Sequence, residues 1–560
     1  MGTCKKKYMM LTFAKKILTT RILSLLIFIS AAITALGQNV YFDSSTKIIN
    51  QTNTNVSPGD TVFLKSGSYD FLLFQDIQGD SLNPITITNY NGEVNISNTH
   101  YFGISFQNCQ YIHLTGTHKY AIRIKEVTNG AGIGISQLSN YFEIDNIEVA
   151  NTKIAGIMCK TDPGCDYKAT RDSFLMEDIH IHDNYIHHTG TEGMYIGNSN
   201  YFGTSVTCNG QDTLLMPHLL KNVSIHDNLI KHTGWDGLQV SSAIENCAVY
   251  GNRIYYDSQE EQDFQMSGLI VGTGSDCDCY NNRIAYGKGI GIEFYGTGGQ
   301  RIFNNIIIEA GKSYFPNDPT KEKYGIYLSK KEILDPDSAF YLYHNTIIRP
   351  KSDGIRFNMS HHESAGNKIQ NNIIIDPGAY SYYEDLNTFR TGNDAYVFLK
   401  DTTMDVTISH NIFRQNLAYP RFLDTSRNNF TLRPSSPAID SGVDLSNDSI
   451  LFDFYYNPRP YGNGYDIGAF EYDPHFLGKE NKTENKTILF PNPAQKYFKV
   501  KGIDRQFHLS LLSFNGTCLY SNENYQPGDS VSTKAFAPGM YFVKLTFNDG
   551  QIKLLKLIIH

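Results

Sequence analysis

Six short segments of the chain alternate apolar and polar residues directly after a glycine. They read GMYIG, GLQVS, GLIVG, GIEFY, GIYLS and GIRFN, and they begin at Gly193, Gly237, Gly268, Gly291, Gly325 and Gly354. This alternation is typical of a β-strand with one buried face. The inward residues are predicted to be Met194, Leu238, Leu269, Ile292, Ile326 and Ile355, with Ile196, Val240, Val271, Phe294, Leu328 and Phe357. The outward residues are predicted to be Tyr195, Gln239, Ile270, Glu293, Tyr327 and Arg356.

An asparagine recurs before these segments and marks a repeat. The pattern Asn-x-Ile or Asn-x-Phe occurs at Asn184, Asn228, Asn252, Asn282, Asn305, Asn345, Asn372 and Asn411. The separations range from 44 down to 23 residues, and in four units the glycine follows nine residues after the asparagine. Short strands at a period near 23, with inserted loops, predict a parallel solenoid whose coils bury their apolar sides by stacking. Asparagine suits the corner because it tolerates the left-handed backbone region and hydrogen-bonds to the asparagine of the next coil.

The composition agrees with β-structure and an exported protein. The 560 residues include 46 Gly, 37 Tyr and 33 Phe, and only 19% are charged. Residues 1–37 carry six basic and no acidic residues around an apolar run from Ile22 to Ala35, which predicts a cleaved signal peptide. Its removal changes the formal charge from −8 to −14, which argues against a nucleic-acid partner. We expect a monomer with no transmembrane segment.

Eight cysteines lie outside the predicted leader, and export permits disulfides. Cys159, Cys165 and Cys208 lie near an irregular insertion that a bridge could fasten. Cys247 and Cys277 occupy the inward position held by Ile179 and Val223 in other units. They are expected to be stacked core residues or a disulfide, since spacing alone does not settle pairing.

Residues 38–472 resemble right-handed parallel β-helix proteins, whose members include pectate-lyase-like enzymes. The opening VSPGDTVFLKSGSY and NPITITNYNGEVNI are similar to the first turns of secreted polysaccharide-degrading members. The closing SSPAIDSG and DIGAFEY resemble the ends of many bacterial β-helix proteins. The resemblance implies an all-β solenoid, and it is specific for the fold and weak for the reaction.

Residues 473–487 are polar and charged and read as a linker. Residues 488–560 resemble the C-terminal sorting domain of the type IX secretion system. The matching features are Pro491-Asn492-Pro493, Pro538-Gly539-Met540-Tyr541, and Lys553 and Lys556 near the end. The resemblance implies a small β-sandwich, a Bacteroidetes-type bacterium, recognition by the export machinery, and a destination outside the cell or on its surface.

Two stretches, NYIHHTGTEGMYIG and NLIKHTGWDGLQVS, place candidate chemistry on consecutive coils. Their alignment stacks His188 on His232, and Glu192 on Asp236, at ~4.8 Å for paired strands. Two carboxylates at that distance repel, so at least one pKa should rise. The remaining candidates on this face are Glu293 for catalysis and Trp235, Tyr195, Gln239, Tyr327, Asp353 and Arg356 for substrate contact.

Three functions fit these residues. In glycoside hydrolysis, one carboxylic acid protonates the leaving oxygen and a second carboxylate is nucleophile or base, for which Glu192, Asp236 and Glu293 are candidates. In β-elimination from a uronic acid, Glu192 and Asp236 would bind Ca²⁺. His188, His232, Lys231 or Arg356 would then remove the proton. A non-catalytic surface adhesin would need only Trp235 and the polar groups.

The sequence therefore predicts an exported enzyme that cleaves glycosidic bonds of an extracellular polysaccharide. Hydrolysis is preferred over elimination because carboxylates outnumber cations on the proposed face. A strongly anionic substrate would be repelled there unless a metal ion bridged it.

Overall fold

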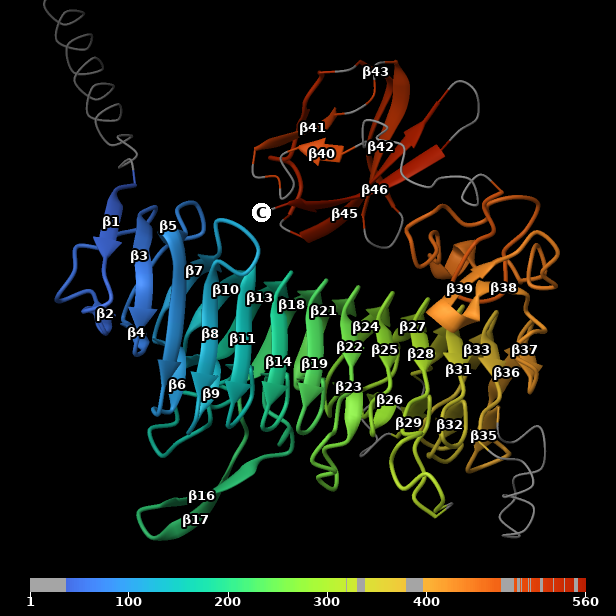
Figure 1. Ribbon diagram of the computed structural model, residues 1–560, viewed down its shortest axis with the longest axis horizontal. Coiled ribbons are helices and arrows are strands. Elements are labelled where there is room, and N and C mark those ends of the chain that lie inside the picture. Colours follow the sequence, from blue (N-terminus) through green and yellow to red (C-terminus); the bar gives the residue numbers. More distant parts are fainter. Residues whose placement is uncertain are drawn as a thin grey trace, which may run out of the picture.

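The computed structural model describes residues 37–318, 320–329, 338–378, 396–474 and, with short interruptions, 488–559. One long coil of β-strands makes up most of the described chain, and a smaller group of strands follows at the C-terminus (Figure 1). The predicted signal peptide, apart from Gly37, and most of the predicted linker lie outside the described residues.

Three parallel ladders run along the coil and enclose its core. Ladder 1 consists of β7 (Gln110–Thr115), β10 (Asn140–Asp145), β13 (Leu175–His182), β18 (Leu219–His226), β21 (Ala243–Tyr250), β24 (Cys277–Tyr280), β27 (Arg301–Phe303), β30 (Tyr341–Tyr343), β33 (Asn367–Gln370) and β36 (Val406–Ser409). Ladder 2 consists of β8 (Ile122–Val127), β11 (Ile147–Thr152), β14 (Tyr185–Thr189), β19 (Leu229–Thr233), β22 (Arg253–Tyr255), β25 (Arg283–Ala285), β28 (Ile306–Ile308), β31 (Thr346–Ile348), β34 (Ile373–Ile375) and β37 (Ile412–Arg414). Ladder 3 consists of β2 (Ile48–Asn50), β4 (Leu72–Gln75), β6 (Phe102–Gln107), β9 (Ala131–Ser136), β12 (Ile157–Cys159), β15 (Met194–Ile196), β20 (Leu238–Val240), β23 (Ser267–Val271), β26 (Ile290–Phe294), β29 (Ile326–Leu328), β32 (Ile355–Phe357) and β35 (Val397–Leu399). The strands β1 (Asn39–Phe42), β3 (Thr61–Tyr69) and β5 (Ile85–Asn98) open the coil and lead into ladders 1 and 2.

The predicted inward residues form the core of the solenoid. All twelve are fully buried in one cluster that extends along the coil. Each apolar side chain stacks on its equivalent in the next coil, as the pairing Met194–Leu238–Leu269 shows. Stacking therefore supplies the burial that a single coil could not achieve.

The corner asparagines form the predicted ladder. Asn228 Oδ1 accepts hydrogen bonds from the backbone N and the Nδ2 of Asn184, both at 3.1 Å. Asn228 in turn donates from Nδ2 to Asn252 Oδ1 at 3.0 Å, and the same pattern continues to Asn411. These buried amides satisfy backbone groups at the corner that would otherwise lack partners.

The six glycines that mark the repeat in ladder 3 are required by packing. A Cβ atom on Gly193 would lie 2.4 Å from the carbonyl oxygen of Gly237, and one on Gly237 would lie 2.4 Å from that of Gly268. Gly291 and Gly325 are equally close to the next coil. These glycines therefore admit no side chain, which explains why glycine recurs at a fixed distance after the asparagine in four units.

The repeated His-Thr-Gly triplet forms a turn between ladders 2 and 3. Thr189 Oγ1 donates to the carbonyl oxygen two residues later at 3.0 Å, and Thr233 Oγ1 does the same at 2.8 Å. The two histidines have left-handed backbone angles, with φ of 54° and 53°. Their rings stack with centroids 4.9 Å apart, and His232 then stacks on Tyr256 at 4.8 Å.

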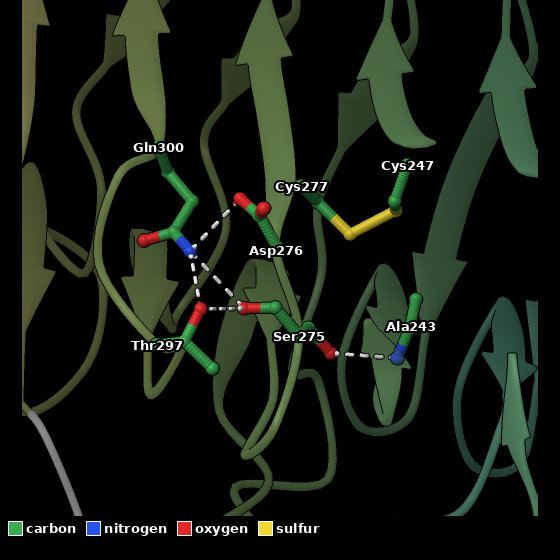
Figure 2. Close-up of a disulfide and its surroundings, with 7 residues drawn as sticks. All are labelled: Ala243, Cys247, Ser275, Asp276, Cys277, Thr297 and Gln300. Carbon is green, nitrogen blue, oxygen red and sulfur yellow. Dashed lines mark hydrogen bonds between the residues drawn. A yellow bond between two sulfur atoms is a disulfide. The ribbon is translucent and has the colours of Figure 1, made fainter. Parts of the chain in front are cut away.

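Two disulfides connect adjacent parts of the coil. Cys165–Cys208 fastens the hairpin of β16 (Thr204–Cys208) and β17 (Gln211–Leu215), while Cys159 is a buried free thiol. Cys247–Cys277 links β21 to β24, so the second of the two sequence alternatives is correct (Figure 2). Beside it, Gln300 Nε2 donates to Asp276 Oδ1 at 3.3 Å.

Residues 415–474 cover the coil beside its last strands (Figure 1). They include β38 (Phe422–Asp424), β39 (Asn429–Leu432) and two short 3-10 helices, η1 (Thr425–Arg427) and η2 (Ser446–Asp448). Arg459 is fixed by a buried ion pair with Glu471 at 2.5 Å, and it also donates to Asn304 Oδ1 at 3.1 Å. The segment thereby binds back onto coils that precede it by more than a hundred residues.

The C-terminal residues form two antiparallel sheets around a separate core. One sheet contains β40 (Ile488–Phe490), β41 (Tyr497–Lys501) and β44 (Val531–Ser532). The other contains β42 (Phe507–Ser513), β43 (Cys518–Tyr525), β45 (Gly539–Thr546) and β46 (Ile552–Ile559). This sandwich contacts the solenoid where Lys556 Nζ lies 2.5 Å from Asp227 Oδ2 and the ring of Phe542 packs 4.8 Å from that of Phe452.

Candidate active site

The outward residues of ladder 3 lie in one column along the solenoid. The backbone register pairs each with the next, and the order is Tyr195, Gln239, Ile270, Glu293, Tyr327 and Arg356. This register is the one that the sequence predicts. Gln239, Ile270 and Glu293 are nevertheless buried, because loops cover the middle of the column.

A second column is formed by the residues that precede the glycines. Gly193 N donates to the carbonyl oxygen of Asp236 at 3.0 Å, and Gly237 N donates to that of Ser267 at 2.9 Å. Glu192, Asp236 and Ser267 therefore occupy equivalent positions in three successive coils. The two acids lie on the same flank of the solenoid, as predicted, and further along the same column are Tyr324 and Asp353.

Asp236 is fully buried, with 0% of its surface exposed. Its Oδ1 accepts a hydrogen bond from the backbone N of Ser267 at 2.7 Å. Its Oδ2 is buried and has no hydrogen-bond partner among the described residues. Burial raises the pKa of Asp236 well above its usual value, and the neighbouring charges of Glu293 and Glu192 raise it further. A neutral, protonated carboxyl is therefore the favoured form.

Glu293 is 7% exposed and is held by two hydroxyl donors. Ser267 Oγ donates to its Oε2, and the Tyr295 hydroxyl donates to its Oε1 at 2.5 Å. Such donors stabilise a charged carboxylate. Ser267 therefore binds both acids, through its backbone N to Asp236 and through its hydroxyl to Glu293, and holds them as a pair.

Glu192 completes the acidic cluster at its other end. It is 4% exposed, and burial raises its pKa while Lys160 lowers it. The Lys160 ammonium also lies 4.9 Å from the ring centroid of Tyr195. A cation and an aromatic ring therefore flank the acids on this side.

Lys323 is a neighbour of the acids that sequence reasoning missed. Burial lowers the pKa of its ammonium, while the charges of Glu293, Asp236 and Asp257 oppose that shift. Lys323 precedes Gly325 by two residues, and Trp235 precedes Gly237 by the same interval. That common offset from the glycine was the available signal, but the long insertion before Gly325 concealed it.

Asp257 is a second buried acid that was not predicted. Burial raises the pKa of its carboxyl to about 6. Its Oδ2 accepts a hydrogen bond from Ser258 Oγ at 2.8 Å. The backbone that follows Asp257 lies against the Asp236 turn. Ser258 N donates to the carbonyl oxygen of Trp235 at 2.8 Å, and Glu260 N donates to that of Gly234 at 2.9 Å.

Arg356 is paired rather than free to bind substrate by itself. Its Nη1 lies 3.0 Å from Glu322 Oε2 and 3.2 Å from Asp353 Oδ2. The guanidinium also lies over the rings of Tyr324 at 4.9 Å and Phe398 at 4.3 Å. The structure therefore places Arg356 and Asp353, both predicted to contact substrate, in an ion pair within a larger polar and aromatic group.

The remaining predicted residues fall into two sets. Trp235, Tyr195 and Tyr327 are half-buried near the acids, and Gln239 donates from Nε2 to Ser241 Oγ at 3.3 Å. His188 and His232 belong to the ring column of the turn. Burial is the main cause that lowers the pKa of His232, and the nearby charges of His188, Lys231 and His187 lower it further.

The acids do not offer a calcium site of the expected kind. Ca²⁺ takes six to eight oxygen ligands. Here Asp236 Oδ1 and both oxygens of Glu293 already accept hydrogen bonds, and the cation Lys323 lies beside them. Of the carboxylate oxygens of Asp236 and Glu293, only Asp236 Oδ2 lacks a hydrogen-bond partner among the described residues. No step is therefore derived through Ca²⁺.

The family comparisons agree with the architecture. Residues 169–335 and 205–389 match the model of a right-handed beta helix region. The solenoid is a right-handed β-helix. Residues 488–560 match a secretion system C-terminal sorting domain, which indicates export by the type IX system to the medium or the cell surface. Within the described part of the chain, no helix is long and apolar enough to cross a membrane.

Solved structures with this fold include several enzymes. The β-helix chain is 13% identical to the pectate lyase Pel9A, covering 78% of this chain and 97% of that one, with a TM-score of 0.40. The lacto-N-biosidase from Eubacterium ramulus is 13% identical, with 68% of each chain covered and a TM-score of 0.40. A family 6 polysaccharide lyase from Pseudopedobacter saltans is 13% identical, covering 70% of this chain and 97% of that one, with a TM-score of 0.35. These low similarities assign no activity to this chain, and no curated protein matches it.

Proposed function

We propose that this β-helix protein hydrolyses glycosidic bonds of an extracellular polysaccharide, with Asp236 and Glu293 as its catalytic pair. The observation that carries the proposal is the buried Asp236 carboxyl, whose Oδ2 lacks a hydrogen-bond partner among the described residues while charged neighbours and burial favour its protonated form. Stability alone does not require such a group, because an unpaired buried polar atom costs free energy.

The two acids have environments that suit opposite roles. A carboxyl whose pKa is raised keeps its proton to higher pH and is suited to protonate the leaving glycosidic oxygen, so Asp236 is the general acid. Glu293 accepts two hydroxyl hydrogen bonds that stabilise its charge, so it is the nucleophile or the base that activates water. Glu192 stabilises the proton on Asp236 through its own charge.

The outward column of ladder 3 suits an extended substrate. Tyr195 and Tyr327 are four coils apart in this column, which is roughly 19 Å at the usual strand spacing. Their rings and that of Trp235 offer flat apolar surfaces for sugar rings. Because Asp236 has no exposed surface, the segment that contains Ser258 and Glu260 must separate from the Asp236 turn when substrate binds.

A second candidate function is β-elimination from a uronic-acid polymer. The observation in its favour is Lys323, whose pKa burial lowers beside the acids. A lysine of this kind can remove a proton from carbon next to a carboxylate. The protonated Asp236 carboxyl would then hydrogen-bond to the substrate carboxylate and offset its charge.

The test is to incubate the secreted protein with a panel of neutral and uronic-acid polysaccharides. Hydrolysis should raise the number of reducing ends without forming the ultraviolet-absorbing unsaturated product of elimination. Asp236→Asn and Glu293→Gln should each lower the rate by about 10²-fold or more. Lys323→Met should have a smaller effect under hydrolysis and abolish an elimination.

A control elsewhere on the coil is Asp276→Asn. Partial desolvation raises the pKa of Asp276 as well, but this exposed residue lies beside the Cys247–Cys277 disulfide and not in the acidic cluster (Figure 2). The control should retain full activity. Unchanged turnover in Asp236→Asn would exclude the catalytic pair. Retained glycan binding without any cleavage would leave an adhesin.

A further inference from the structure

A second cluster of ligand-type side chains lies on ladder 1, on a different side of the solenoid from the acids of ladder 3. His113 on β7 is paired in register with Glu143 on β10, and Thr115 on β7 is paired with Asp145 on β10. Residues two apart in a strand point to the same face, so His113, Glu143 and Asp145 share one face. This cluster takes no part in the proposed hydrolysis.

The three side chains converge on one point. His113 Nε2 lies 2.6 Å from Asp145 Oδ2 and 3.7 Å from Glu143 Oε2. Their ligand atoms all lie within 4.8 Å of one another, and in the part of the chain that the structure describes this is the one group of three or more His, Cys, Asp or Glu residues with that property. The spacing requires only small side-chain movements to admit a metal ion between them.

Each carboxylate is oriented by a separate donor. Thr115 Oγ1 donates to Asp145 Oδ1 at 2.7 Å, and Asn146 Nδ2 donates to the same oxygen. His182 Nε2 lies 3.0 Å from Glu143 Oε1. In both acids, therefore, one oxygen is held by a neighbour and the other oxygen faces His113. Donors that orient ligands in this way are the usual second layer of protein metal sites.

We infer that His113, Glu143 and Asp145 form a Zn²⁺ site. Imidazole nitrogen and carboxylate oxygens are ordinary zinc ligands, and the two negative charges of Glu143 and Asp145 match the charge of the ion. Three protein ligands leave a fourth position for water or a substrate atom. The His113 side chain is 29% exposed, so solvent can reach that position.

The test is isothermal titration calorimetry of the full secreted chain with Zn²⁺ alone. The protein is purified with an affinity tag that contains no histidine. The wild type should bind one equivalent. Asp145→Asn and Glu143→Gln keep the side-chain shape and should each weaken binding by more than about 100-fold, and the positioning variant Thr115→Val should weaken it by about 10-fold. Co²⁺ should give the visible absorption of a low-coordinate site, and His113→Gln should abolish it.

The matched control is His187→Gln. His187 Nε2 lies 3.2 Å from Glu148 Oε1 on the same sheet, which is a similar histidine–carboxylate contact without a second acid in the group. Circular dichroism should show that every variant is folded. Absence of Zn²⁺ binding by the wild type, or equal binding by the Asp145→Asn and Glu143→Gln variants, would overturn the inference.

Discussion

Replacing Asp236 by asparagine should stabilise the protein at pH values above the usual carboxyl pKa of 3.8. Burial raises the pKa of the Asp236 carboxyl well above its usual 3.8, and Glu293 and Glu192 raise it further. The folded chain therefore keeps a proton on Asp236 at pH values where the unfolded chain has released it. Because the folded state binds more protons there, the contribution of Asp236 to stability falls as the pH rises. Asparagine carries no proton that changes between the two states.

The size of this stability difference follows from the one proton that Asp236 releases on unfolding. Between pH 3.8 and the pKa of the folded state, the free energy of unfolding of the wild type should fall by about 1.4 kcal/mol per pH unit relative to the variant. Below that window both states are protonated and the difference becomes constant. The amide Oδ1 of asparagine can still accept the hydrogen bond from Ser267 N, so the variant keeps the one bond that the carboxyl makes.

Urea unfolding at a series of pH values between the usual carboxyl pKa and neutrality measures this difference. Trp235 is the only tryptophan of the chain and adjoins Asp236, so its fluorescence reports on this turn, and circular dichroism reports on the whole coil. The control is Asp43→Asn, whose stability relative to the wild type should not rise with pH, because a hydrogen bond from Ser45 lowers the pKa of the exposed Asp43. A stability difference that stays flat with pH, or a variant less stable at every pH, would refute the burial of a protonated Asp236.

Three further variants test other parts of the structure. Asn252→Ala removes four buried hydrogen bonds. At about 1–3 kcal/mol for each buried group left without a partner, the free energy of unfolding should fall by several kcal/mol. A loss below about 1 kcal/mol would contradict the asparagine ladder. Trp235→Ala should raise KM for a polysaccharide more than it lowers kcat, and the opposite pattern in steady-state kinetics would remove it from substrate binding. Replacing Cys165 and Cys208 by serine removes a cross-link with a sequence separation of 43. Urea unfolding should show that the free energy of unfolding falls by about 4 kcal/mol. Unchanged stability and unchanged proteolysis of the hairpin would show that the disulfide does not fasten it.

The fold could be predicted because each coil repeats its own constraints. Asparagine satisfies the corner, glycine avoids the next backbone, and the two residues that flank an outward position fill the core, so the sequence shows all three at fixed offsets. The same offsets predicted that Glu192 and Asp236 share a column. Pairing of Cys247 with Cys277 stayed open, because core packing and a disulfide both place two cysteines in adjacent coils.

The candidate site was predicted only in part, because loops supply half of it. Asp257 comes from an insertion that no period relates to the acids, and the long insertion before Gly325 concealed the repeat position of Lys323. The burial of the acids was missed for the same reason, since alternation of apolar and polar residues shows which way a side chain points and not what covers it. The ladder 1 cluster was also missed, because Glu143 and Asp145 precede the first asparagine of the repeat pattern, and His113 is one further coil away.

The β-helix separates the positions that hold the coil from those that can carry chemistry. At the six glycines that mark the repeat in ladder 3, a side chain would collide with the next coil, as the 2.4 Å approach at Gly237 shows. One residue earlier the side chain leaves the coil, and the column contains an acid at Asp236, a hydroxyl at Ser267 and an aromatic ring at Tyr324 without any change in the backbone path. Substitutions in that column therefore change the chemistry beneath the covering loops without changing the backbone path. The stacking distance then brings each new group within reach of the next, which is how Ser267 comes to bind both Asp236 and Glu293.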